Sequence, residues 1–212
     1  MSFGPAGDAF AYALVALLVI IDPVGTAVLF AGLTPGDSDE ARGRQAIRAC
    51  VIAFVVLASF GFGGRELLGA LGIDLPAMKV AGGVLLFLTA ADMVTARGAL
   101  RGSEQERDAA TRTQDISVFP LAIPFIAGPG AMTSMVLLQS QAGGRLWPML
   151  AIQAALAVAV AATLLALLSA RYLARALGQT GSNVVGRVLG VLLAALAAQL
   201  VLDGIRESLG LH

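Results

Sequence analysis

The chain has 212 residues, of which 58% are hydrophobic and only 13% are charged, and its mean hydropathy is +0.84. Soluble domains carry about 25% charged residues, and a soluble fold of this size needs much more polar surface than this chain offers. The formal net charge is zero, so no basic field attracts nucleic acid. The composition therefore excludes a soluble enzyme, a nucleic-acid binder and a disordered chain. It predicts an all-α polytopic membrane protein whose main partner is the lipid bilayer.

Apolar runs predict six transmembrane helices within a single transmembrane domain, residues 1–212, at about 20 residues per span. The predicted helices cover residues 9–33, 45–69, 76–97, 117–140, 147–174 and 184–206. No Lys or Arg precedes the first run, and a cleavable signal peptide needs a basic segment there. The first run is therefore expected to be a retained helix.

The distribution of arginines predicts the orientation in the membrane. With six spans, ten arginines fall on one side, and they are Arg42, Arg44, Arg48, Arg97, Arg101, Arg107, Arg112, Arg171, Arg175 and Arg187. The other side has only Arg65, Arg145 and Arg206. Positive charge favours the cytoplasmic side, which makes residues 98–116 a cytoplasmic loop and puts both termini outside the cytoplasm. The bias towards Ala, Leu and Arg is typical of GC-rich bacteria, so we expect a multi-pass protein of the bacterial inner membrane.

The chain contains an internal repeat. Pro23 and Pro129 are 106 residues apart, and Arg65–Gly72 matches Arg171–Gly178 at the same offset. The two repeats cover about 9–97 and 117–206. Because each half contains an odd number of helices, the second half must insert upside down. Inverted repeats of this kind are common among secondary transporters.

Two of the predicted helices contain breaks at equivalent positions. The first is interrupted by Asp22-Pro23-Val24-Gly25-Thr26, and the fourth by Gly128-Pro129-Gly130, with Pro120 and Pro124 before it. Proline removes a backbone donor, so the half-helices after each break begin near the membrane midplane with free N–H groups and positive dipole ends. Such ends suit a small anion. The predicted substrate-binding residues are Asp22, Pro23, Gly25, Thr26, Gly128, Pro129, Gly130, Thr133 and Ser134.

The alternative interpretation of each break is a proline kink, with Asp22 bonded only to freed backbone groups. Residues proposed for coupling or gating are Asp22, Lys79, Asp92, Arg187 and Gln199, with a proton or a sodium ion as the coupling ion. Gly82, Gly83 and Gly190 are interpreted as close helix-packing positions. The only histidine is His212 and the only cysteine is Cys50, so no metal, cofactor or enzymatic activity is expected. The sequence carries no signal for the oligomeric state.

Several motifs together resemble the MarC family of bacterial inner-membrane proteins. They are Ile21–Gly25, Lys79–Phe87 with Asp92, Pro120–Pro124, Ile126–Ala131, Arg187–Gly190 and Leu202–Ile205. The resemblance implies a six-span carrier, and some family members are assigned as carriers of small neutral amino acids. Asp22 stands where the family often has Asn, and Lys79 stands where it usually has Arg. The family's usual second proline is absent from Ala27-Val28-Leu29.

These observations favour a secondary transporter of a small polar metabolite, with a small neutral amino acid as the expected small-molecule substrate. The competing hypothesis is a non-transporting membrane scaffold or stress-response partner protein, in which the breaks only shape helix packing.

Overall fold

Every secondary-structure element of the computed structural model is helical within the residues that it describes, 6–34, 36–95 and 115–210. The elements are α1 (Ala6–Ile21), α2 (Pro23–Leu33), α3 (Asp39–Ala70), α4 (Leu75–Thr95), η1 (Ser117–Ile126), α6 (Pro129–Gln141), α7 (Leu146–Leu168) and α8 (Ala170–Ser208). Within these described residues, five stretches are long and apolar enough to cross a membrane, or six if the bent pair of η1 and α6 counts as one. The expectation of a helical membrane protein is confirmed. Of the predicted loop 98–116, only residues 115 and 116 lie within the described residues.

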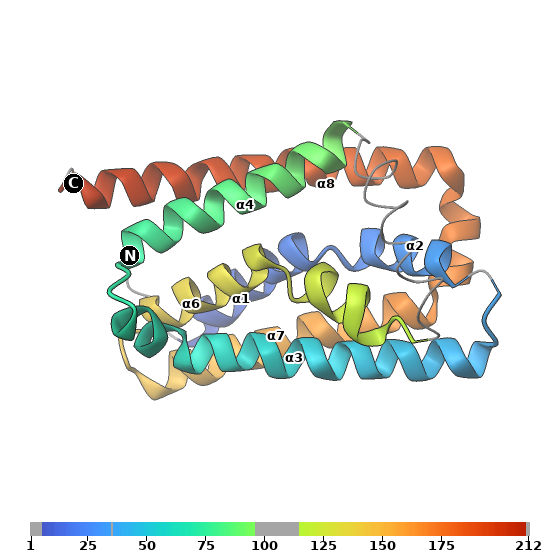
Figure 1. Ribbon diagram of the computed structural model, residues 1–212, viewed down its shortest axis with the longest axis horizontal. Helices are drawn as coiled ribbons and strands as arrows, with labels where there is room; N and C mark the ends of the chain where they lie inside the picture. Colours follow the sequence, from blue (N-terminus) through green and yellow to red (C-terminus); the bar gives the residue numbers. More distant parts are fainter. Residues whose placement is uncertain (1–5, 35, 96–114, 211–212) are drawn as a thin grey trace.

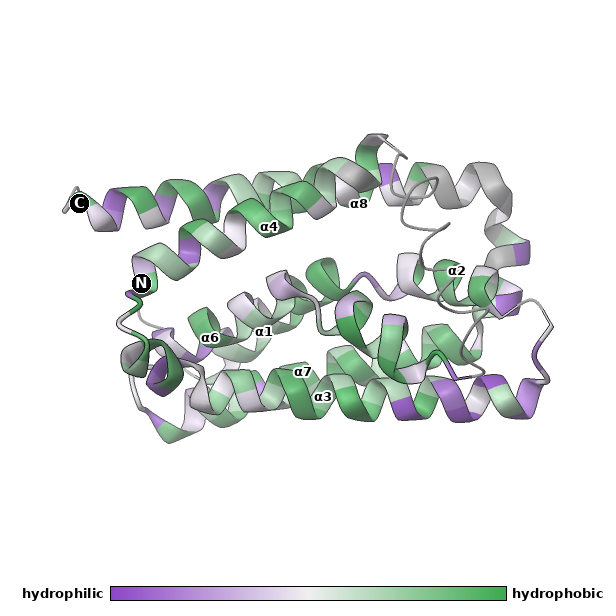
Figure 2. Ribbon diagram, in the orientation of Figure 1, coloured by the Kyte–Doolittle hydropathy of each residue, from purple (hydrophilic) through white to green (hydrophobic). Residues whose placement is uncertain are grey.

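The helices run side by side along one axis, and the two ends of the chain lie at the same end of the bundle (Figure 1). Most polar residues lie towards the two ends, while the middle of the bundle is apolar (Figure 2). This is the pattern that a hydrocarbon layer about 30 Å thick requires.

The core is divided into two clusters. The larger one is built by α1, α2, α3, η1, α6 and α7, and its largest buried side chains include Leu17, Phe30, Leu57 and Leu156. The smaller one joins α4 to α8 through Leu86, Ala90, Leu193 and Ala197. Figure 1 accordingly shows α4 and α8 packed together along one side of the bundle.

Close approach of α4 and α8 depends on small residues. A Cβ added to Gly83 would lie 2.8 Å from the Ala197 carbonyl oxygen, and one added to Gly190 would lie 2.9 Å from Met93 Cβ. Both distances are too short for any larger residue. The interpretation of these glycines as helix-packing positions is therefore confirmed, in line with the small residues found at membrane helix interfaces.

Two predicted boundaries were wrong. The second predicted range, 45–69, begins too late, because α3 starts at Asp39, where the Ser38 hydroxyl accepts from Ala41 N at 3.2 Å and caps the helix. Hydropathy overlooks this polar first turn. The fifth range, 147–174, ends too late, since α7 stops at Leu168 and α8 begins at Ala170.

The segment 177–183, predicted as a connection, is helical within α8 except at Gly178. Helix-favouring Ala, Leu and Arg make up most of residues 170–176, before Gly178, and the helix resumes after Gly178 although residues 179–183 are polar and include a glycine. Gly178 takes φ 56° and ψ −178°, a conformation open almost only to glycine, so the chain changes direction there. The candidate span itself, 186–208, lies close to the predicted 184–206.

The course of η1 follows from its prolines. Phe119 and Ile123 have extended backbone angles inside the segment, and each precedes a proline, Pro120 and Pro124. Proline disfavours helical angles in the residue before it. The wide turns of η1 are bent by 54° relative to α6, so the fourth span is irregular in one half and helical in the other.

Candidate functional site

The first interruption lies at Asp22, between α1 and α2. Asp22 has φ 47° and ψ 74°, and it is the only residue other than glycine with a positive φ among the described residues. Its Oδ1 accepts from Gly25 N at 3.0 Å, and the side chain caps α2 while Pro23 takes the first helical position. Only 8% of Asp22 is exposed. The carboxylate is therefore held inside the bundle by the start of α2.

The hydrogen bonds displaced at this interruption are replaced locally. In a continuous helix, Gly25 N would donate to Ile21 O. Here Gly25 N donates to Asp22, and the Thr26 hydroxyl donates to Ile21 O at 3.0 Å instead. A Cβ on Gly25 would lie 2.1 Å from Asp22 Oδ2, so the turn needs glycine. The Thr26 hydroxyl therefore donates its hydrogen to the backbone and not to a ligand.

The second interruption lies between η1 and α6 and is built differently. Gly128 is the N-cap of α6 and Pro129 the first helical residue, but no side chain caps this end. The first intrahelical bond runs from Met132 N to Gly128 O at 3.0 Å. Helix geometry leaves the N–H groups of Gly130 and Ala131 without intrahelical acceptors. Both residues are buried, so two amide donors begin α6 inside the bundle without the side-chain cap that α2 has.

The other predicted residues of α6 lie against α4. The Thr133 hydroxyl donates to Pro129 O at 2.8 Å, and its methyl group lies where a side chain on Gly82 would have to stand. Ser134 is buried beside it. Gly130 lies against Leu86, since a Cβ there would come within 2.2 Å of Leu86 Cδ2. Leu86 therefore covers the first turn of α6.

The two interruptions lie at similar levels along the bundle. Helix α1, which ends at the first interruption, packs on α6, which begins at the second. Helix α2, which begins at the first interruption, packs on η1, which ends at the second. Val19 and Ile20, at the end of α1, pack on the small cluster that contains Leu86, which also contacts Gly130. Figure 1 shows both breaks near the middle of the long axis, with α2 and α6 leaving in opposite directions. The end of α1 and the start of α6 therefore both lie against the small cluster that joins α4 to α8.

The residues proposed for coupling or gating, apart from Asp22, lie elsewhere. Lys79 forms an ion pair with Glu207 of α8, and Arg187 is exposed. Gln199 is exposed and donates to Asp203 Oδ1 at 2.8 Å on the same helix. The side chain of Asp92 lies outside the described residues. The structure does not bring Lys79, Arg187 or Gln199 to the interruptions.

Leu86 and the contact of Gly82 with Thr133 were not predicted as parts of the site. Both residues lie in the motif Lys79–Phe87, but an apolar side chain in a membrane helix gives no sign of which neighbour it covers. Among the described residues, no group of three or more His, Cys, Asp or Glu side chains is arranged to hold a metal ion.

Residues 7–209 match the family model described as MarC family integral membrane protein. The chain is 35% identical over 142 residues to a UPF0056 membrane protein of Archaeoglobus fulgidus, covering 67% of each chain. It is 30% identical over 152 residues to UPF0056 membrane protein YvbG of Bacillus subtilis, covering 69% of this chain and 72% of YvbG. It is 29% identical over 124 residues to UPF0056 membrane protein YhcE of Escherichia coli, covering 58% of each. No solved structure matches the chain. With the family model matching almost its whole length, the chain belongs to the MarC family of integral membrane proteins.

Proposed function

We propose that this protein is a secondary transporter of a small polar metabolite, with a small neutral amino acid as substrate. The observation that carries the proposal is the pair of interruptions near the middle of the bundle, with the end of α1 and the start of α6 both lying against the small cluster of α4 and α8. A simple proline kink in each helix does not account for two helix starts that lie at similar levels inside the bundle. In this proposal the protein carries its substrate unchanged, without a cofactor.

The two interruptions differ in a way that suits an amino acid. The first turn of α6 offers the amides of Gly130 and Ala131 and has no side-chain cap, which suits a carboxylate at the positive end of a helix dipole. The carboxylate of Asp22 accepts from Gly25 N and keeps further lone pairs for an ammonium group. The substrate's carboxylate is thus assigned to α6, and its amino group to Asp22.

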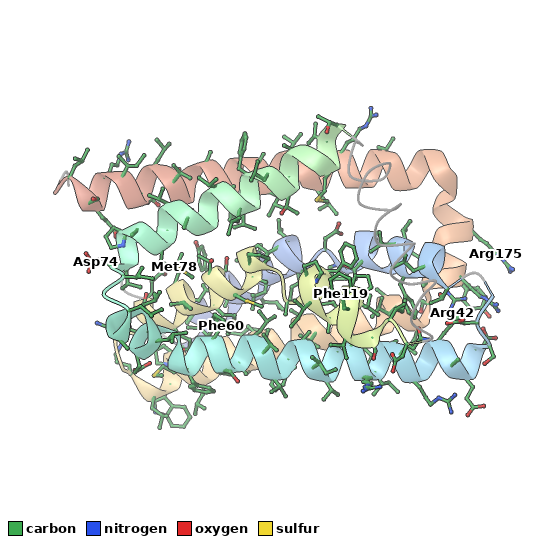
Figure 3. All side chains as sticks on the ribbon, viewed as in Figure 1. Arg42, Phe60, Asp74, Met78, Phe119 and Arg175 are labelled. Atoms are coloured by element: carbon green, nitrogen blue, oxygen red, sulfur yellow. The ribbon has the colours of Figure 1, made fainter. Side chains whose placement is uncertain are left out.

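The inverted repeat is part of the proposal, and the placement of its matching segments supports it. Arg65 belongs to the stretch of α3 that lines a cavity with Asp74 and Glu207, whereas Arg171 and Arg175 line a second cavity with Asp39. Asp74 and Arg175 lie at opposite ends of the bundle (Figure 3). Two halves inserted in opposite directions would place their matching segments in this manner, and such halves can exchange conformations to expose a central site to either side.

For the orientation, we propose the bacterial inner membrane with both termini on the non-cytoplasmic side. The arginine-rich ends of α3 and α8 would then face the cytoplasm. Leu86 lies on Gly130 in this conformation, so substrate access requires α4 and α6 to separate there. A proton or a sodium ion bound with Asp22 would couple this movement to a gradient.

Uptake by proteoliposomes tests the proposal. Purified protein is reconstituted and flux of labelled alanine, glycine, serine and threonine is followed under imposed proton and sodium gradients of both directions. We expect flux of at least one of the four above empty vesicles, and its loss in Gly128→Ala, where a Cβ would lie 2.6 Å from the Pro124 carbonyl oxygen.

The matched control is Gly63→Ala, since a Cβ at Gly63 meets nothing within 4 Å. This variant should transport like the unmodified protein. Absence of flux for all four amino acids in both gradient directions would refute the amino-acid proposal. Unchanged flux in a folded Gly128→Ala variant would refute the site and favour a scaffold role for the breaks.

A further inference from the structure

A cavity of about 240 Å³ opens where the start of α3 meets the end of α7 and the start of α8. Its polar lining consists of Asp39, Arg42, Arg171, Tyr172 and Arg175. Figure 3 shows Arg42 and Arg175 at this same end of the bundle, far from the interruptions near its middle. The proposed substrate site contains none of these residues.

The cavity carries a surplus of positive charge. Three arginines line it against one carboxylate, a net charge of +2 (3 − 1). Asp39 is engaged by Arg171 at 2.8 Å, and within the described residues no carboxylate lies in ion-pair distance of Arg42 or Arg175. Two arginines therefore line the same cavity without an ion pair of their own among the described residues.

Arg42 is positioned by its surroundings. Only 7% of it is exposed, and its guanidinium lies 5.5 Å from the centre of the Phe30 ring, a cation–π geometry. Asp39 and Asp37 act on its charge only from beyond ion-pair distance, and a buried charge without a direct ion pair is costly. A planar guanidinium fixed in this way is also suited to bidentate binding of a phosphate. An anion in the cavity would remove that cost.

The apolar lining places the cavity at the edge of the hydrocarbon layer. Leu167 and Leu168 end the apolar helix α7, and Leu168 is 51% exposed. Tyr172 is 76% exposed and lies one turn further on, as is typical of aromatic residues at the membrane interface. The arginines thus lie just beyond a lipid-facing apolar surface, at the level where phosphate groups of lipids lie.

We propose that this cavity binds the phosphate of an anionic glycerophospholipid, with its acyl chains along the exposed leucines of α7. Arg42 and Arg175 bind the phosphate oxygens, and Arg171, held by Asp39, closes the third side. The shared chemistry is a phosphate ester, and the apolar wall selects a lipid over a soluble phosphate. Basic pockets between membrane helices bind anionic head groups in this way.

Native mass spectrometry of the full-length protein in detergent tests the proposal without reference to transport. The probes are phosphatidylglycerol, phosphatidylcholine and glycerol 1-phosphate, titrated separately. We expect phosphatidylglycerol to bind at least about tenfold more tightly than the other two. The choline group of phosphatidylcholine neutralises its phosphate charge, and glycerol 1-phosphate lacks acyl chains to lie along Leu167 and Leu168. Arg175→Gln and Arg42→Lys should each weaken phosphatidylglycerol binding, by about tenfold for Arg175→Gln.

The control variant is Arg44→Gln, which removes the same charge two residues from Arg42. Arg44 is exposed, pairs with Glu40 at 3.3 Å, and lies outside the cavity lining. It should bind phosphatidylglycerol like the unmodified protein. Since Arg175 is exposed, Arg175→Gln should fold normally, as gel filtration would verify.

Three results would overturn the proposal. One is an equal loss of binding in Arg44→Gln, which would indicate general attraction by surface charge. Another is equal binding of phosphatidylcholine, which would remove the selectivity for an anion. The third is equal or tighter binding of glycerol 1-phosphate, which would identify a soluble phosphate ester as the ligand.

Discussion

Leu86 of α4 lies directly on Gly130 of α6, so closely that a Cβ on Gly130 would come within 2.2 Å of Leu86 Cδ2. Leu86 is almost completely buried, and the residue beneath it is the first amide donor of α6. One apolar side chain therefore covers a helix start that has no side-chain cap. This contact joins the α4–α8 pair to the helices of the larger core.

Adding a methyl group at Gly130 should destabilise the protein through Leu86. We expect Gly130→Ala to lower the free energy of unfolding by about 1–3 kcal/mol, the usual cost of overpacking. In a Leu86→Ala background the same change should cost much less, because the clash is gone. Unfolding in a denaturing detergent series, arranged as a double-mutant cycle, measures the difference.

The control for this cycle is Gly63→Ala, in a helix where the added Cβ meets nothing within 4 Å. Replacing glycine by alanine there should stabilise the helix by up to about 1 kcal/mol. Equal costs of Gly130→Ala in the presence and absence of Leu86 would show that this contact carries no strain.

Substitutions at Asp22 should distinguish its role as the N-cap of α2 from the role of its negative charge. Asn tolerates a left-handed backbone and caps helices as well as Asp does, so Asp22→Asn should fold with nearly unchanged stability. Asp22→Ala loses the bond to Gly25 N and should cost about 1 kcal/mol for the cap, with strain at φ 47° added. Thermal unfolding of both variants measures this.

Transport by the same two variants tests the role of the charge. If Asp22 holds an ammonium group or a coupling ion, Asp22→Asn should lose most of its flux although it folds. Flux retained in Asp22→Asn and lost only in Asp22→Ala would assign Asp22 to capping alone.

Asp115, just before the fourth span, should make stability depend on pH. Hydrogen bonding to Ser117, whose backbone N–H donates to Asp115 Oδ1 at 2.9 Å, holds the pKa of this carboxyl below its ordinary value, and Arg48 lowers the pKa further. The charged form is favoured in the folded state, so its contribution is complete above the unfolded-state pKa of about 3.9. It is lost as the pH falls through the lower folded-state pKa.

The measurement is the unfolding temperature between pH 7 and pH 3 for the unmodified protein, Asp115→Asn and Arg48→Gln. Asp115→Asn should flatten the acid limb of the curve. Arg48→Gln should keep most of that limb, because the hydrogen bond from Ser117 N remains. An acid limb unchanged in Asp115→Asn would assign the pH dependence to other carboxyls.

The ion pair between Lys79 and Glu207 joins the start of α4 to the end of α8. Lys79 is largely buried whereas Glu207 is half exposed, so we expect Lys79→Gln to cost about 0.5–1 kcal/mol. The exchange Lys79→Glu with Glu207→Lys should restore part of it. Unfolding at low and high salt checks this, since salt screens the exposed partner; equal stability of both single variants and the unmodified protein would mean that the pair contributes nothing.

The sequence was sufficient to predict the helical membrane class and the approximate spans, because both follow from runs of apolar residues longer than a bilayer core. It also drew attention to Asp22 and to Gly128–Gly130, since charges, prolines and paired glycines stand out in an apolar span. Helix ends were less accurate. The start of α3 at Asp39 depends on the hydrogen bond between Ser38 and Ala41. The course of α8 through 177–183 depends on the positive φ of Gly178. Hydropathy detects neither feature.

What only the tertiary structure decided is which of those residues meet. The pattern placed Thr26 and Thr133 as donors to a ligand, but each hydroxyl donates to its own backbone, at Ile21 and Pro129. It also proposed Lys79 and Gln199 for coupling or gating, and the structure pairs them with Glu207 and Asp203. The contact of Leu86 with Gly130 could not be predicted from the sequence, because any leucine in a membrane helix suits the hydrocarbon layer equally well. The place of Leu86 over Gly130 comes from the close packing of α4 on α6, which Gly82 permits by leaving room for Thr133.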